Sequence, residues 1–170
     1  MRRRICLVGA TLSVCLLASL AGTALAASSK SSAKATKVSC SVSTSIAVAN
    51  GQSNVLPPVA QGDEYGPAKC GSLLGAGVQK DSFTVPTSGD TVAKYVMYFN
   101  TGTIHGTYDL TPQSSSLNFL ATNWTGTLKV LGGTGAYKRV TGTGKMKCGS
   151  PDGIHTSCTD KLKLKNLTAG

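Results

Sequence analysis

No segment of this sequence shows sustained helical periodicity, and aromatic residues make up only 5% of its 170 residues. The missing 3.6-residue period argues against a helical bundle or a helix-covered parallel sheet. After residue 26 no apolar run is long enough to span a bilayer as a helix. Gly, Ser and Thr are abundant instead, a composition that suits strands and turns. The fold expected from these properties is all-β.

The N-terminal residues have the organisation of a secretory signal peptide. Three arginines at residues 2–4 precede an almost continuous apolar run over residues 5–20, and Ala24-Leu25-Ala26 supplies the small residues of a cleavage site. We predict a signal peptide that ends at Ala26, a flexible tether over residues 27–36 and one domain over residues 37–170. The protein is therefore expected to be secreted, extracellular or periplasmic, and of bacterial type.

Six cysteines are present, two of them inside the predicted signal peptide. One of these, Cys15, ends a loose match to a lipobox, so lipidation is an alternative, although the residue before it is bulky. An even number of cysteines in an exported chain predicts two disulfides. Of the three connectivities that four cysteines allow, we favour Cys40–Cys70 and Cys148–Cys158, because each pair is close in sequence. No cysteine has a C-x-x-C partner, so no zinc site is expected.

Alternating apolar residues predict strands along most of the chain. The first is a long half-buried strand from Val38 to Val48. Further strands are expected over residues 78–85, 91–99, 103–111, 119–131, 140–148 and 155–166. Residues 51–77, which contain three prolines, are predicted to form a long irregular loop that Cys70 pins to the first strand. Seven or eight strands joined by tight turns predict an antiparallel, calycin-like β-barrel, with a sandwich as the alternative.

The glycine-rich segment at residues 132–135 is not expected to bind a nucleotide. It lacks the G-x-G-x-x-G spacing of a dinucleotide site, and a new strand begins almost at once. Lys145 follows Gly144, but the chain lacks the earlier glycine and the Ser or Thr of a phosphate-binding loop. We predict that these glycines form a sharp corner between two strands. The corner consists of Gly132, Gly133 and Gly135.

A strand at residues 124–131, the GGTG corner and a glycine-bearing strand at residues 140–144 follow one another directly. Together with a G-x-x-x-G-x-Y strand at residues 102–108, this order resembles the barrel of the allene oxide cyclase and dirigent superfamily. The resemblance implies an eight-stranded barrel with a central cavity, used by the plant enzymes for cyclisation or for orienting phenoxy radicals. The cyclases rely on a buried glutamate, whereas the only glutamate here, Glu64, falls in the predicted loop. The glycine corner is the one element that carries over.

Few polar residues are placed for chemistry. His105 and Asp109 are expected on one face of a strand, about 13 Å apart, and therefore on a solvated outer wall. His155 is expected in an exposed loop, with a metal site shared with His105 as the alternative. The adjacent acids Asp63 and Glu64 are expected in a solvated loop. We predict no catalytic, cofactor or metal-binding residue.

Basic residues concentrate towards the C-terminus of a chain whose formal net charge is +10. In the last two predicted strands lysines occupy odd positions, while the even positions are apolar except for Asp160. The expected basic face consists of Lys145, Lys147, Lys161, Lys163 and Lys165. If Cys148 lies opposite Cys158, then Lys145 lies opposite Lys161, and directly opposed like charges are destabilising. This favours an anionic partner, with solubility and protection against edge pairing as the alternative.

These observations predict a secreted, non-catalytic binding protein. It is expected to bind a small apolar ligand inside the barrel or an anionic cell-envelope polymer on its lysine face. A cyclase- or isomerase-like enzyme is the alternative, and it would require a buried acid or base near a cavity. Nucleic acid is not expected as a partner, because the protein is exported and no aromatic residues lie between the lysines.

Overall fold

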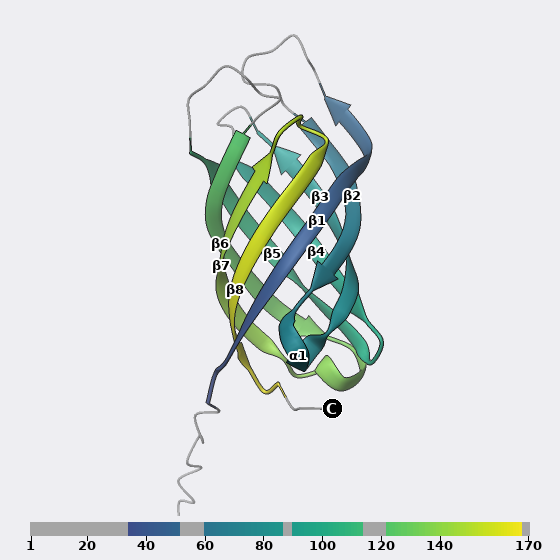
Figure 1. The fold of residues 1–170 in the computed structure, drawn as a ribbon, viewed down its shortest axis with the longest axis vertical. Coiled ribbons are helices and arrows are strands. Elements are labelled where there is room, and N and C mark those ends of the chain that lie inside the picture. The colour runs from purple at the N-terminus through teal and green to yellow at the C-terminus, as the bar shows by residue number, and fades with distance from the viewer. Residues whose placement is uncertain (1–33, 52–59, 87–89, 114–121, 168–170) are drawn as a thin grey trace, which may run out of the picture. The chain divides into compact units, whose positions relative to one another are not determined.

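The computed structural model describes residues 34–51, 60–86, 90–113 and 122–167. Within them eight strands form one closed barrel in which sequence neighbours pair antiparallel and β1 closes onto β8 (Figure 1). The strands are β1 (Thr36–Gly51), β2 (Ala60–Lys69), β3 (Ala76–Val85), β4 (Thr91–Phe99), β5 (Gly102–Pro112), β6 (Thr122–Gly133), β7 (Thr141–Ser150) and β8 (His155–Lys165). The all-β antiparallel barrel is confirmed. The predicted signal peptide and most of the tether lie outside the described residues.

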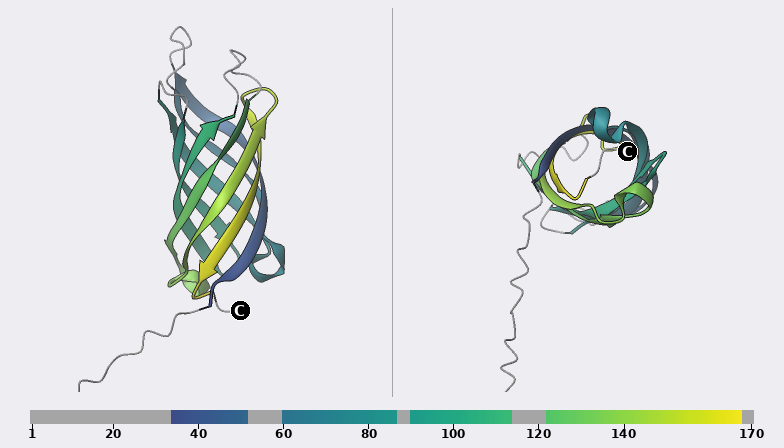
Figure 2. Two further views of the ribbon diagram at one scale, coloured as in Figure 1. Left: turned by 90° about the vertical axis from the view of Figure 1, so that its left-hand side faces the viewer. Right: turned by 90° about the horizontal axis from the view of Figure 1, so that it is seen from below.

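The strands are tilted relative to the barrel axis, as Figure 2 shows. A walk along paired residues from Val38 on β1, once round all eight strands, returns to β1 at Ala49 instead of Val38. A closed barrel needs such a stagger, because tilt and register are linked. Rows of side chains that follow the hydrogen-bonding direction therefore wind round the wall like a screw thread.

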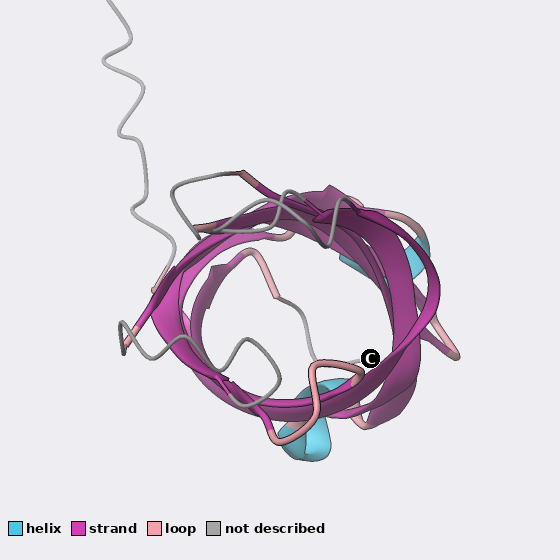
Figure 3. Cartoon of the chain, turned by 90° about the horizontal axis from the view of Figure 1, so that it is seen from above, coloured by secondary structure: helices cyan, strands magenta, loops and turns pink. Residues whose placement is uncertain are grey.

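Side chains alternate between the inside and the outside of this wall, which is a single layer of strands when seen along the barrel (Figure 3). On β4, for example, Tyr95 and Met97 are buried, whereas Val92 and Tyr98 are exposed. Leu128, Leu162 and many other aliphatic side chains project into the interior from the remaining strands. Burial of this apolar surface is the main force that favours the closed barrel.

Both predicted disulfides are present. Cys40–Cys70 ties β1 to the residue that follows β2, and Cys148–Cys158 joins directly opposed positions of β7 and β8. All four cysteines are buried. The second disulfide also establishes the register expected for the lysines of these two strands, because Lys145 lies opposite Lys161.

The loop predicted over residues 51–77 is the main error of the sequence analysis. Residues Ala60–Lys69 form β2, and Gly71–Leu74 form the short helix α1. The inward positions of β2 are Gly62, Glu64, Gly66 and Ala68, so the strand has no apolar alternation that could have revealed it. Its pairing partners β1 and β3 hold it in the sheet.

The glycine corner lies between β6 and β7 and contains one turn of 3₁₀-helix, η1 (Gly135–Tyr137). We predicted that both Gly133 and Gly135 take backbone angles that a side chain resists. This is right for Gly135, which has φ +57°, but Gly133 does not have a positive φ. A side chain at Gly133 is instead excluded by the carbonyl oxygens of Thr103 and Tyr137, which lie where a Cβ would be.

Candidate functional site

The five lysines of the predicted basic face are all exposed, and they lie on the outer wall of β7 and β8. Two lysines outside the prediction enlarge this face. Lys37 on β1 pairs directly with Lys163, and Lys129 on β6 pairs with Thr143. The basic face therefore spans four adjacent strands, which lie side by side in Figure 1. It comprises Lys37, Lys129, Lys145, Lys147, Lys161, Lys163 and Lys165.

No acid interrupts this face on any of its four strands. β1, β6 and β7 contain neither Asp nor Glu, and the one acid of β8, Asp160, points into the barrel. Within the described residues, the ion pairs are Lys80–Asp63 and His155–Asp152, so no lysine of the basic face is neutralised by a neighbour. The positive charges are balanced only by solvent ions.

Two outward rows of side chains cross the basic face at right angles to the strands. The first row runs from β1 to β6 through Lys37, Lys163, Thr143 and Lys129. The second row runs beside it through Ser39, Lys161, Lys145 and Thr127. These rows lie outside a cavity of about 1680 Å³. The cavity is lined by residues of all eight strands, including the inward-pointing Val38, Phe83, Tyr108 and Leu128, so it lies inside the barrel and not on the basic face.

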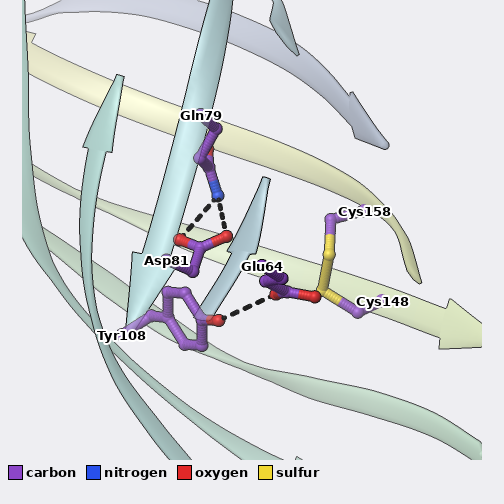
Figure 4. The surroundings of a disulfide bond; sticks show 6 residues. All are labelled: Glu64, Gln79, Asp81, Tyr108, Cys148 and Cys158. Carbon is purple, nitrogen blue, oxygen red and sulfur yellow. Dashed lines mark hydrogen bonds between the residues drawn. A yellow bond between two sulfur atoms is a disulfide. The ribbon is translucent and has the colours of Figure 1, made fainter. Parts of the chain in front are cut away.

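A second candidate site lies inside the barrel, where three acids are buried. Glu64 on β2 lies opposite Asp81 on β3, and Asp160 projects inward from β8. The Gln79 amide donates to both oxygens of Asp81, at 3.0 and 2.9 Å, and the Tyr108 hydroxyl donates to Glu64 over 3.5 Å (Figure 4). Of the acids drawn in Figure 4, Glu64 lies beside the disulfide between β7 and β8.

Burial dominates the electrostatics of the acid cluster. Loss of hydration raises the pKa of Glu64 and of Asp81, and it raises the pKa of Asp160 to about 7. The nearby carboxyl group of Glu64 adds to the effect of burial on Asp81 and raises its pKa further. Burial, together with these carboxylates, also raises the pKa of Tyr108, which stays a hydrogen-bond donor.

The acid cluster has too few donors for its acceptors. Oε1 of Gln79 and Oδ1 of Asp160 are buried without a hydrogen-bond partner, and no Lys, Arg or His is buried among the described residues. A proton on Asp160 offsets part of this deficit. In the described ranges no three His, Cys, Asp or Glu side chains are grouped as a metal ion would require. Gln79, Asp81 and Asp160 are each only 1% exposed, so these side chains are shielded from bulk solvent.

The remaining polar candidates lie apart from both sites. His105 and Asp109 are exposed on the outer face of β5, as predicted. His155 is exposed at the start of β8, where its ring lies 2.6 Å from the carboxylate of Asp152. Asp63 is half-exposed and bonds to Lys80 and Ser82.

The prediction that Glu64 lies in a solvated loop is wrong, because its side chain is buried inside the barrel. The sequence offers one clue to the acid cluster, which is the position of Asp160 in a row of otherwise apolar residues on β8. Asp81 has no such clue, because both faces of β3 mix polar and apolar residues.

No family model, curated protein or solved structure matches this chain. The resemblance to the allene oxide cyclase and dirigent barrels therefore rests on the sequence motif and stays a prediction. None of the described helices is long and apolar enough to cross a membrane.

Proposed function

We propose that this protein is a secreted binding protein whose basic face attaches to an anionic polymer of the cell envelope. The observation that carries the proposal is that two pairs of lysines lie directly opposite each other on adjacent strands. Lys145 lies opposite Lys161, and Lys37 lies opposite Lys163. Solubility alone needs charges that are spread over the surface, whereas this arrangement concentrates them.

The opposed lysines have an energetic cost that an anionic partner would remove. Like charges directly opposite one another destabilise a sheet by roughly 0.2–1 kcal/mol per pair. A polyanion placed along the face replaces this repulsion with attraction and displaces small counterions. The same charges would also steer a polyanion to the face, since acids are missing from the outer walls of β1, β7 and β8.

A small apolar ligand inside the barrel is the other candidate. A cavity of about 1680 Å³, whose inward lining includes Val38, Phe83 and Leu128, supports it. Ligand extraction from natively exported protein, followed by mass spectrometry, tests this possibility directly.

One observation favours a cyclase- or isomerase-like enzyme as the second candidate. Glu64 is a buried acid that accepts a hydrogen bond from Tyr108, and a buried acid is the feature that an enzyme would require. A panel of reactive epoxides can be screened for a cyclic product of one handedness. An enzyme that uses this acid should lose turnover in Glu64→Gln while keeping its circular dichroism spectrum.

The proposed function is tested by binding to purified anionic wall polymer at low salt. We expect the triple variant K145Q/K161Q/K163Q to lose most of the affinity, and wild-type affinity to fall steeply as salt rises, because exposed charges are screened over about 8 Å at physiological ionic strength. The control K69Q/K80Q/K94Q removes the same charge from the other side of the barrel and should bind like wild type. Equal binding by wild type and both variants would refute the proposal.

A further inference from the structure

Inside the barrel, the acid cluster adjoins the cavity. On each of three strands, a residue of the cavity lining lies two positions from an acid on the same inward face. These pairs are Gly62 and Glu64 on β2, Phe83 and Asp81 on β3, and Leu162 and Asp160 on β8. Residues two apart on a strand are about 7 Å apart. Tyr108, which also lines the cavity, donates a hydrogen bond to Glu64, so polar and apolar parts of the interior meet there.

The acid cluster lacks hydrogen-bond donors and positive charge. Oδ1 of Asp160 and Oε1 of Gln79 have no hydrogen-bond partner, although each side chain is only 1% exposed. A buried acceptor without a donor costs free energy, which a donor from a ligand would recover. Three carboxyl groups point into the barrel, and no Lys, Arg or His is buried among the described residues to balance them. Both deficits favour a ligand that supplies N–H donors together with a positive charge.

We infer that the barrel binds a small apolar molecule that ends in an ammonium group, with this group at Asp160 and the apolar part in the cavity. An alkylammonium group has three N–H donors, and its hydrogen bonds to a carboxylate are strengthened by charge. The apolar part would pack against Val38, Phe83 and Leu128 of the lining. The site lies inside the barrel, so this inference is independent of the basic face.

An ammonium group fits the acid cluster better than a metal ion does. The described part of the chain contains no group of three His, Cys, Asp or Glu side chains placed to hold a metal. A metal ion requires several ligand atoms at short distance at once, whereas an ammonium group can pair with one carboxylate and share its other donors among nearby acceptors. The apolar lining of the cavity also gives a bare metal ion nothing to bind, but it suits the body of an apolar amine.

The protonation of Asp160 provides a signature for this mode of binding. Burial raises the pKa of its carboxyl group to about 7, so the group must lose a proton before it can pair with an ammonium group. The other ionisable side chains buried on the strands are the acids Glu64 and Asp81 and the phenols Tyr95 and Tyr108, so no cation of the protein competes. An alkylammonium group stays charged in this range, because its pKa is close to that of lysine, about 10.4. Affinity should therefore rise from about pH 5 to about pH 8.

The experiment compares octylamine with octanol by isothermal titration calorimetry of the exported protein. The two probes share one apolar chain and differ in the group at its end. At pH 8 we expect octylamine to bind at least about tenfold more tightly than octanol, because hydrogen bonds to charged groups are the stronger ones. At pH 5 the affinity for octylamine should fall by at least about tenfold, and the affinity for octanol should stay the same.

Two variants that differ only in position show where the ammonium group binds. Asp160→Asn keeps the shape of the buried side chain but cannot become negative, so it should remove both the preference for octylamine and its pH dependence. Octanol should bind this variant as it binds wild type, which shows that the cavity is intact. Asp109→Asn changes an exposed acid on the outer wall of β5 and should bind octylamine like wild type.

The wild-type comparison is decisive even if Asp160→Asn does not fold. Equal affinity for octylamine and octanol at pH 8, or no binding of either probe, would overturn the inference. Equal losses in Asp160→Asn and Asp109→Asn would also overturn it, because the amine would then bind acids in general. Neither probe is an anion, so these results leave the proposed function untouched. Conversely, the variant K145Q/K161Q/K163Q should lose polymer binding and bind octylamine like wild type.

Discussion

The two faces of β8 treat charge in opposite ways. Lys161, Lys163 and Lys165 point outward, are exposed and have no acidic partner within the described part of the chain. Asp160, which precedes Lys161 in the chain, points inward and is 1% exposed. Adjacent residues on one strand therefore lie in different environments, the acid Asp160 in the barrel interior and the base Lys161 in solvent.

The comparison shows that solvent, and not the number of ion pairs, determines how each charge is tolerated. Outside, water and salt screen the repulsion between lysines, so a cluster of like charges costs little. Inside, burial removes hydration, so the pKa values of the carboxyl groups rise and favour the protonated form. The outward lysines stay charged and available to a partner, whereas burial favours the neutral form of the inward acids.

The largest effect is expected from placing a lysine on the wrong face. Leu164→Lys buries a cation at a position that is 0% exposed, and it should cost at least about 4 kcal/mol of the free energy of unfolding. The outward control Thr159→Lys should cost less than about 1 kcal/mol, since it only adds an exposed charge opposite Lys147. Urea denaturation measures both, and Leu164→Ala separates the lost packing from the buried charge. Similar costs for the two lysines would mean that the two faces are not distinct environments.

The next effect is a loss of stability as pH rises. The pKa of Asp160 is raised above its unfolded value, so its contribution to stability is complete below about pH 4 and is lost as pH rises through about 7. Between pH 5 and pH 8 the free energy of unfolding should fall by about 2–3 kcal/mol, at 1.36 kcal/mol per pKa unit. Asp81 adds to this loss, because burial raises its pKa as well.

Asp160→Asn should flatten the pH dependence, because the amide does not ionise. The control Asp109→Asn changes an exposed acid on the outer wall of β5 and should leave the slope as it is. Thermal unfolding at pH 5 and pH 8 provides the measurement. A wild-type protein that is equally stable at both values would show that the acid cluster does not hold extra protons.

A smaller effect is expected at the glycine corner between β6 and β7, where the chain leaves the strand and side chains no longer alternate between the inside and the outside of the barrel. Gly133→Ala should cost about 1–3 kcal/mol, because its Cβ meets two backbone carbonyl oxygens that cannot move aside. Gly132→Ala should be nearly neutral, since its Cβ meets only the ring of exposed His105 at 3.3 Å. Comparison of the two melting temperatures checks this contrast, and equal melting temperatures would contradict it.

The smallest effect should be a gain in stability. Lys161→Gln removes the repulsion with Lys145 and should stabilise the protein by about 0.2–1 kcal/mol at low salt. Lys94→Gln is the control, because Lys94 lies opposite Thr107 and Ser82 instead of another lysine. The difference between the variants in urea denaturation should vanish at high salt. A loss of stability in Lys161→Gln would mean that the opposed lysines do not repel each other.

Much of the fold could be predicted because most strands alternate apolar and polar residues. The expected strand over residues 91–99 is the observed β4, and the corner expected between two strands lies between β6 and β7. β2 could not be found in this way, since its inward residues are glycine, alanine and Glu64. The lysine positions of the basic face were predictable from the odd spacing on β7 and β8. Lys37 was not, because β1 is distant in sequence, and Lys129 was not, because it is the only lysine on β6 and shows no such spacing.

By itself the sequence determined the alternation of side chains along most strands and the excess of positive charge, and it favoured the observed pairing of the cysteines among three possible ones. Only the tertiary structure decided which charges meet. Closure of β1 onto β8 places Lys37 opposite Lys163, and pairing of β2 with β3 places Glu64 opposite Asp81. The physical reason is that register and tilt in a closed barrel are set by all eight strands together, so contacts across strands cannot be read from any one of them.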